Sequence, residues 1–273
     1  MNDNSLHATD ILDQIIATKR QELAARAEAH ASESDLRAIP LEGMQGVKAQ
    51  RSRSLRQALL DSPTGIIAEF KRKSPSRGWI HADARPEEVV PAYAAAGAAA
   101  LSILTDEHYF GGSLEFIRRV RPLVDLPILR KDFIIEPVQL VEARQAGADA
   151  VLLIAACLDR GDCAALTAEA HRLGLEVLLE IHSAEELDYI TPDIDVVWVN
   201  NRHIGTFVTD VRTSFELASR LKEIPVFISE SGISEAGTVR ALREAGYRGF
   251  LMGENFMKHD EPGAALAAFI QAI

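Results

Sequence analysis

The sequence has little cysteine and no long apolar run, and each scarcity excludes a class of protein. Its two cysteines, Cys157 and Cys163, cannot form a disulfide framework and make no CxxC pair. Reduced cysteines that serve packing in a cytoplasmic protein are therefore expected. The longest apolar run, residues 150–158, is far shorter than the roughly 18 residues of a membrane span. The N-terminus has neither the basic nor the apolar segment of a secretion signal, so no signal is expected.

Basic residues are fewer than acidic residues, and the histidines are scattered along the sequence. The 29 Lys and Arg against 40 Asp and Glu give a net charge of −11, so neither nucleic acid nor an anionic membrane is expected as the main partner. An anionic ligand would need a local cluster of positive charge. The 8 histidines show no HxH or HxxxH spacing, so no metal and no other cofactor is expected. A monomer or a weak homo-oligomer is expected.

A repeating unit organises the chain from residue 65 onward. A helical stretch ends in glycine, as at Gly97, Gly147, Gly174 and Gly246, and an apolar run follows. Such alternation indicates βαβ units and a parallel sheet. The predicted strands are residues 66–70, 100–104, 127–129, 150–154, 176–180, 196–200, 225–228 and 249–252. The predicted helices are residues 86–96, 114–120, 137–146, 163–173, 184–189, 214–221, 234–245 and 264–273.

Eight such units predict the α/β class and a (β/α)8 TIM barrel. A doubly wound open sheet is the alternative, but it usually has fewer strands and a glycine-rich first turn. Residues 1–60 are predicted to be an N-terminal helical extension, with an amphipathic helix at 11–30, a polar loop at 31–53 and a short helix at 54–60. The chain 1–273 is predicted to be a single domain with its barrel at 61–273. No fused second enzyme is expected.

Polar residues follow the predicted strands, where active sites of such barrels lie. The first strand ends in Glu69 and Lys71, which share a face because strand side chains alternate. Unpaired buried charge is costly, so this pair needs either each other or a ligand. A surface salt bridge explains one such strand end. It does not explain the set that converges on one rim, which also contains Lys131, Glu180, Asn200, Arg202, Glu230 and Glu254.

The last two loops have the composition of a phosphate site. Barrels commonly bind phosphate with the loops after strands seven and eight and the N-terminus of a short extra helix. Ser231-Gly232 and Gly253-Glu254 occupy those places, and residues 255–258 are short enough to be that helix. Ordinary turn glycines explain either loop alone but explain both together less well. Four apolar residues lie near the same strand ends: Phe110 and Phe133 follow strands two and three, and Leu152 and Leu251 lie on strands. All four are also typical core residues. Only their position makes the two phenylalanines candidates for stacking on an aromatic substrate.

Taken together, these segments resemble the indole-3-glycerol-phosphate synthase family of tryptophan biosynthesis. The similarity runs in order through ILDQIIATKRQEL, IIAEFKRKSPSRG, LTDEHYFGGSLE, LPILRKDFI, GADAVLLIAA, LLEIH, VNNR, SESGI and FLMGENFM. It implies a carboxy-lyase that closes an indole ring on 1-(2-carboxyphenylamino)-1-deoxyribulose 5-phosphate, a small anionic substrate, with loss of carbon dioxide and water.

The resemblance also implies roles for individual residues. Lys131 would be the general acid and Glu180 the general base, assisted by Glu69, Lys71 and Asn200. Substrate contacts would come from Ser74, Phe110, Phe133, Leu152, Arg202 and Leu251. The phosphate would be held by Ser231, Gly232, Gly253 and Glu254. Two departures from the family pattern, Trp79 and His203-Ile204, affect the expected loop detail.

Two other functions fit parts of the sequence. A phosphoribosylanthranilate-type isomerase on the same barrel would use a Cys and an Asp at strand ends, whereas the first strand here ends in Glu and Lys. A non-catalytic subunit that binds a phosphate ligand would explain the two loops. It would not explain Lys131, Glu180 and Glu69 on one rim.

Overall fold

The computed structural model describes residues 11–30, 53–202 and 208–273, and the chain divides into two units, Met1–Ser52 and Arg53–Ile273. The described part of the first unit is the helix α1 (Ile11–His30), which confirms the predicted helix. Its apolar residues Leu12, Ile15, Ile16 and Leu23 recur at the spacing of one helix face. Apart from Arg53, the loop predicted at 31–53 lies outside the described residues.

The second unit contains a closed barrel of eight parallel strands, as the sequence predicts. Around the barrel the strands follow the chain order, and the last pairs with the first. They are β1 (Ile66–Phe70), β4 (Ala100–Leu104), β5 (Ile128–Lys131), β6 (Ala150–Ile154), β7 (Glu176–Ile181), β8 (Val196–Asn200), β9 (Phe227–Glu230) and β10 (Gly249–Met252). The strand predicted at 225–228 begins and ends two residues later, so that it includes Glu230.

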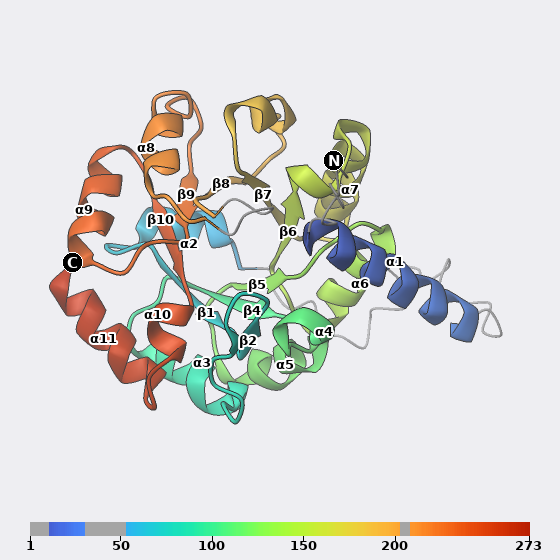
Figure 1. Cartoon of the computed structure of the whole chain (residues 1–273), viewed down its shortest axis with the longest axis horizontal. Coiled ribbons are helices and arrows are strands. Elements are labelled where there is room, and N and C mark those ends of the chain that lie inside the picture. Colours follow the sequence, from blue (N-terminus) through green and yellow to red (C-terminus); the bar gives the residue numbers. More distant parts are fainter. Residues whose placement is uncertain (1–10, 31–52, 203–207) are drawn as a thin grey trace, which may run out of the picture. The chain divides into compact units, whose positions relative to one another are not determined.

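Helices surround the strands (Figure 1). They are α3 (Pro86–Ala95), α5 (Leu114–Val120), α6 (Pro137–Ala146), α7 (Arg160–Arg172), α8 (Arg212–Ala218), α9 (Ala236–Glu244) and α11 (Pro262–Ala272), with the 3₁₀ turns η2 (Arg121–Leu123), η3 (Ala155–Cys157) and η4 (Ala184–Tyr189). The helix predicted at 184–189 is therefore a 3₁₀ helix. Across the parts of the chain that the structure describes, no helix combines the length and the apolar character needed to cross a membrane.

Strand alternation sorts the apolar residues into two layers. On β1, Ile66, Ala68 and Phe70 pack toward the helices, whereas Ile67 belongs to the smaller cluster inside the barrel. Glu69 shares the inward parity of Ile67. The same rule aims Lys131, Glu180, Asn200 and Glu230 inward, because each lies two residues beyond an inward apolar residue of its own strand: Leu129, Leu178, Trp198 and Ile228.

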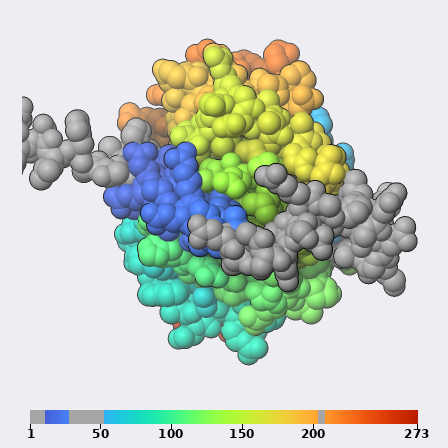
Figure 2. Space-filling view, turned by 90° about the vertical axis from the view of Figure 1, so that its right-hand side faces the viewer, coloured from blue at the N-terminus to red at the C-terminus, as the bar shows by residue number. Residues whose placement is uncertain are grey.

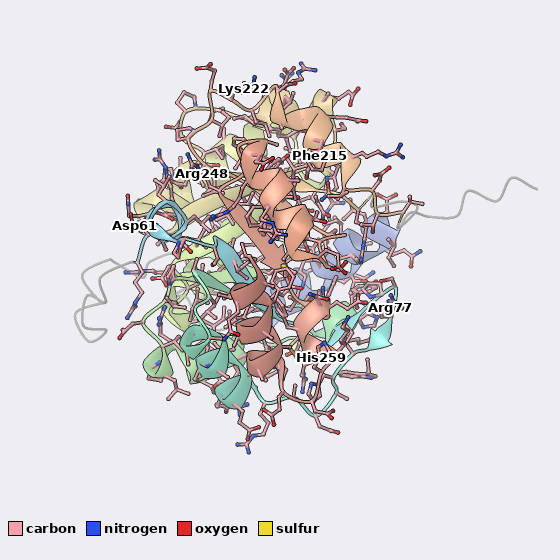
Figure 3. The ribbon with its side chains drawn as sticks, turned by 90° about the vertical axis from the view of Figure 1, so that its left-hand side faces the viewer. Asp61, Arg77, Phe215, Lys222, Arg248 and His259 are labelled. Atoms are coloured by element: carbon pink, nitrogen blue, oxygen red, sulfur yellow. The ribbon has the colours of Figure 1, made fainter. Side chains whose placement is uncertain are left out.

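One end of the barrel is closed by the short helix α2 (Leu55–Asp61). Its Leu55 and Leu59 are buried in the cluster inside the barrel. Ser54 caps the helix by accepting a hydrogen bond from the Gln57 amide at 2.9 Å. Figure 3 shows Asp61, at the end of α2, and Arg77, beyond β1, at opposite ends of the unit. The carboxyl ends of the strands therefore form the other, open end.

Three small elements lie at that open end. An antiparallel hairpin of β2 (Lys73–Ser74) and β3 (Gly78–Trp79) follows β1. The one-turn helix α4 (Glu107–Phe110) follows β4, and α10 (Glu254–Met257) follows β10. The sequence predicts the last of these at 255–258, one residue later, but it predicts neither the hairpin nor α4. All three arise from loops, where hydrophobic periodicity carries little signal.

Candidate active site

A cavity of about 340 Å³ lies at the carboxyl ends of β1, β9 and β10. Its lining brings together eight of the residues predicted for the site: Glu69, Lys71, Arg202, Ser231, Gly232, Leu251, Gly253 and Glu254. It also contains Glu230, which the sequence placed on the rim without a role, and Arg77 and Lys258, which the prediction left out. Lys131, Glu180 and Asn200 are carried inward on β5, β7 and β8 of the same barrel.

Glu69 and Lys71 pair with each other, which answers the question that the sequence left open. Lys71 Nζ lies 2.7 Å from Glu69 Oε1, and the Glu69 side chain is fully buried. A buried pair of this kind is costly to break, since one charge would remain without its partner. A Cβ at Gly253 would lie only 2.4 Å from Glu69 Oε1. The glycine after β10 therefore makes room for this carboxylate.

Lys131 ends β5 and places its ammonium over an aromatic ring. Its Nζ lies 4.9 Å from the centre of the buried Trp198 ring, a cation–π contact inside the barrel. Burial acts to lower the pKa of Lys131. The facing carboxylates outweigh that effect and raise the pKa above its usual range; they are those of Glu230, Glu180 and Glu69. Lys131 is thus a charged proton donor held among acceptors.

Glu180 is a buried carboxylate with several partners. Asn200 Nδ2 donates a hydrogen bond of 3.1 Å to Glu180 Oε1, and His182 Nε2 lies 3.1 Å from the same oxygen. Burial acts to raise the pKa of Glu180. Its interactions with His182, Lys131 and Asn200 outweigh burial and hold the pKa below the usual range. Glu180 is therefore ionised and able to accept a proton.

Glu230 is a rim residue to which the prediction gave no role. Burial raises its pKa, and the nearby carboxylates of Glu69 and Glu180 add to the effect against Lys131 and Lys71. The pKa of Glu180 is thus lowered and that of Glu230 is raised. Opposite pKa shifts of this kind let one carboxyl group act as the base and the other as the acid. Extending the seventh strand by two residues in the prediction would have placed Glu230 beside Glu69.

The loop after β9 has an unusual backbone. Ser231 and Gly232 have φ angles of 70° and 73°, and Ser231 is the one described non-glycine residue with positive φ. Asn201 stabilises this loop: its Nδ2 donates to Ser229 Oγ and to the Ser231 carbonyl, both at 3.0 Å. Its Oδ1 accepts from the Ser214 amide and hydroxyl. Asn200 thus binds Glu180, whereas the adjacent Asn201 stabilises the loop. The sequence alone did not distinguish the roles of these two asparagines.

Positive charge gathers around the loops after β9 and β10. Arg77, Arg202 and Lys258 line the cavity beside Ser231 and Gly232. Arg77 also forms an ion pair of 3.1 Å with Glu254, so this carboxylate is partly neutralised. The acidic protein therefore has the local cluster of positive charge that an anionic ligand would need. Arg77 and Lys258 were missed because exposed basic residues in loops resemble an ordinary solvated surface.

The predicted aryl-binding residues come together in part. The rings of Phe110 and Phe133 have centroids 6.1 Å apart. Phe133 packs against the apolar cluster inside the barrel, which includes Leu152 and Leu251. Ser74 is buried, and its hydroxyl makes no hydrogen bond to any residue that the structure describes. A buried polar group of this kind calls for an explanation, and a substrate contact is one.

Of the two departures from the family pattern, Trp79 is the one that lies within the described residues. Trp79 is 55% exposed and belongs to strand β3 of the hairpin, with Arg72 and Lys73 over its ring at 5.6 and 5.7 Å. It therefore affects the loop beside the site. His203-Ile204 lies outside the described residues.

The cysteines do not act as the acid or base of an isomerase. Burial raises the pKa of the Cys157 thiol, and the carboxylates of Glu180 and Glu186 add to this shift. The thiol is thus neutral and a poor base at neutral pH. Cys163 is buried in the layer between strands and helices.

Removal of metal ions is expected to leave activity unchanged. In residues 11–30, 53–202 and 208–273, no group of three His, Cys, Asp or Glu side chains is placed to hold an ion. The expected proton donor and acceptor are side chains. The check is the rate of the expected ring closure after exhaustive treatment with EDTA. Loss of that rate and its recovery with one specific divalent ion would contradict the prediction.

Comparisons with known proteins agree over almost the whole chain. A family model described as indole-3-glycerol phosphate synthase matches residues 12–269. The indole-3-glycerol phosphate synthase of Bacteroides thetaiotaomicron is 58% identical over 264 residues, which are 97% of this chain and 99% of that protein. Those of Burkholderia multivorans and Burkholderia vietnamiensis are 40% and 41% identical over 265 residues, which are 95% of this chain and 98% of theirs.

Proposed function

The chain belongs to the indole-3-glycerol phosphate synthase family, and from that premise we propose how its residues divide the work of the reaction. The enzyme is a carboxy-lyase of tryptophan biosynthesis. It converts 1-(2-carboxyphenylamino)-1-deoxyribulose 5-phosphate to indole-3-glycerol phosphate, with loss of carbon dioxide and water. Phosphate and carboxylate groups on this small substrate fit the local positive charge of the cavity. The reaction takes place in the cytoplasm.

The substrate phosphate binds between the loops after β9 and β10. Amides of Ser231, Gly232, Gly253 and Glu254 approach its oxygens, because glycines leave the backbone uncovered. Arg77 and Lys258, which line the same cavity, supply countercharge. Glu254 contributes its amide, while its carboxylate stays paired with Arg77.

The aryl ring of the substrate lies among Phe110, Phe133, Leu152 and Leu251. Phe133, Leu152 and Leu251 share one apolar cluster, and Phe110 lies against Phe133. An apolar surrounding solvates a carboxylate poorly, which favours loss of carbon dioxide. Arg202, Lys71 and Ser74 contact the anionic and hydroxyl groups of the substrate.

Ring closure begins when the aryl carbon that bears the carboxylate attacks the ketone carbon. Negative charge develops on the ketone oxygen, and Lys131 donates the proton that turns it into a hydroxyl. Carbon dioxide leaves with its bonding electrons remaining in the ring. The single observation that carries this proposal is geometric: inside the barrel, Lys131 Nζ lies 4.9 Å from the ring centre of Trp198, the residue of β8 that pairs with Glu180 of β7.

Loss of water then needs one acid and one base. Glu230, whose pKa is raised, donates a proton to the departing hydroxyl. Glu180, whose pKa is lowered, takes a proton from the carbon beside the nitrogen, which completes the indole. Asn200 orients Glu180 through its hydrogen bond, and the Glu69–Lys71 pair fixes the charge of the opposite wall.

Incubation with the aryl-amino ribulose phosphate tests the whole assignment. The expected result is the absorbance of an indole chromophore together with release of one carbon dioxide per product. Binding of the substrate without turnover would instead support a non-catalytic subunit that binds a phosphate ligand.

The change Gly232→Asp is expected to raise KM much more than it lowers kcat. A carboxylate there repels the substrate phosphate and crowds the amides that bind it. Gly232 has a φ of 73°, and an added Cβ would lie 3.0 Å from the Thr209 methyl, so any side chain strains the loop. Gly232→Ala is therefore the matched control, because it adds the same Cβ without the charge. Steady-state kinetics of both variants decide: equal KM values for Asp and Ala would place the phosphate elsewhere.

A further inference from the structure

Lys131 lies among three carboxylates but forms an ion pair with none of them. Glu230, Glu180 and Glu69 all act on its charge through space. Among the described residues, however, no carboxylate oxygen comes within 4.0 Å of Lys131 Nζ. A general acid needs this freedom, because an ammonium that is bound to a carboxylate directs its protons there and not at the substrate. Some other contact must therefore hold the Lys131 ammonium in place.

The direct contact that the structure gives this ammonium is with the face of the Trp198 ring. Lys131 Nζ lies 4.9 Å from the ring centre, inside the distance of about 6 Å over which the ring quadrupole attracts a cation. The Trp198 side chain is fully buried, whereas Lys131 is partly exposed. The ring therefore supports the ammonium from within the barrel, and the other side of the ammonium is left for the substrate.

The barrel holds the Trp198 ring firmly. Trp198 lies on β8, which β6 and β7 separate from β5, so the ring crosses the interior to reach Lys131. Its backbone pairs with Glu180 of β7 and Ile228 of β9, and its side chain belongs to the apolar cluster inside the barrel. Outside β7 packs α7, whose surface is yellow-green in Figure 2. A ring in such a close-packed interior has little room to move.

Hydrogen bonding does not explain why this position carries an indole. Trp198 Nε1 is buried and has no hydrogen-bond partner within the described parts of the chain. An unpartnered buried N–H group is costly and calls for an explanation. A leucine or a phenylalanine would fill space in the barrel without this cost. The indole has one advantage over both, because its face attracts a cation more strongly than that of any other side chain.

We infer that Trp198 is a positioning residue for the general acid: its ring face holds the Lys131 ammonium apart from the surrounding carboxylates and toward the substrate ketone. Without the ring, attraction between opposite charges in this poorly solvated site draws the ammonium onto Glu180 or Glu230. Its protons then point at a carboxylate and not at the ketone oxygen. Trp198 itself gives and takes no proton. The inference rests on the proposed role of Lys131 as the acid.

The first experiment compares Trp198→Leu with Trp198→Phe. Leucine removes the ring face, so kcat is expected to fall by about tenfold to thirtyfold, the size of a desolvated cation–π contact. The KM value should change little, because Lys131 remains present and charged. Phenylalanine keeps a ring face and loses only an unpartnered N–H group, so its kcat should stay within about threefold of the wild type. A wild-type kcat in Trp198→Leu would overturn the inference, and so would an equal loss in both variants.

A double variant separates positioning of Lys131 from a general effect on packing. Trp198→Leu added to Lys131→Met should cause no further loss of kcat, because no ammonium is left to hold. A multiplicative loss would show that the ring acts independently of Lys131. An equal rise of KM in both backgrounds would show that the ring binds the substrate instead. Either result would overturn the inference, whereas near-normal turnover in Lys131→Met alone would overturn the role of Lys131 itself.

Fluorination tests the ring face with little change in its size. The chain has two tryptophans, so Trp79→Phe leaves Trp198 as the only one. Production of this variant with 5-fluorotryptophan withdraws electron density from the Trp198 ring, which should lower kcat by about twofold relative to the unlabelled variant. The label should have no effect once Lys131→Met is added. An equal kcat with and without the label would show that the ring acts by shape alone, contrary to the inference.

Phe227→Leu is the matched control for Trp198→Leu. Phe227 is a buried aromatic residue on the neighbouring strand β9, but it packs toward the helices, with its ring 4.7 Å from that of Tyr247. The change removes a buried ring without touching Lys131, so wild-type kcat is expected. A loss of kcat equal to that of Trp198→Leu would mean that any loss of packing in the barrel slows the reaction, and the inference would fail.

Discussion

Replacement of Lys131 by methionine is expected to leave substrate binding intact and to lower kcat by at least about 10²–10⁴-fold. Methionine keeps the length and the apolar stem that packs over Trp198 but has no proton and no charge. The developing negative charge on the ketone oxygen would then lack its donor. Loss of a transition-state interaction lowers kcat and kcat/KM together. Steady-state kinetics and a direct measurement of substrate affinity separate the two effects.

Lys222→Met provides the control for this prediction. Lys222 is exposed at the surface of the barrel unit, far from Arg77 at the open end (Figure 3). The same change there removes the same charge, and wild-type kcat is expected. Near-normal turnover in Lys131→Met at saturating substrate would show that another group is the acid.

Replacement of Glu180 by glutamine is expected to reduce kcat by a similar factor, about 10²–10⁴-fold. The carboxamide can still accept the hydrogen bond from Asn200, but it cannot take a proton. Because Lys131 and Glu180 act in one sequence of steps, the double variant should lose less than the product of the two single losses. Measurement of kcat for the wild type, both single variants and the double variant tests this coupling.

Glu185→Gln is the control for that change. Glu185 is an exposed carboxylate on η4, close in sequence to Glu180 but outside the lining of the cavity. Its kcat should equal that of the wild type. Independent, fully multiplicative losses in the double variant would mean that the two residues do not serve one sequence of steps.

The fold was predictable because its signals are local and repeated. Glycine follows a helix before four of the strands, apolar runs recur in all eight units, and each run forms a strand of the closed barrel. The predicted strand ends are wrong by a few residues where the strand continues beyond the apolar run. The last residues of β5 and β9, Lys131 and Glu230, are charged, so a search for apolar runs ends before them.

The site was only partly predictable, as the segment Arg130-Lys131-Asp132 shows. Arg130 points outward, where it pairs with Asp132 at 3.0 Å and donates to the Gln139 carbonyl at 2.6 Å. Lys131 points inward over Trp198. Strand parity counted from Leu129 separates these two basic residues, because neighbouring side chains on a strand face opposite sides.

The sequence by itself determined the eight-unit barrel and placed the chemistry at the carboxyl ends of its strands, because periodicity and strand alternation act over short distances along the chain. Only the tertiary structure decided which polar groups meet. The pairing of Glu69 with Lys71, the opposite pKa shifts of Glu180 and Glu230, and the contact of His182 with two carboxylates depend on strand register and loop conformation. The paired residues are close in sequence, but their burial and their pKa shifts depend on strands distant in sequence, which no local pattern encodes.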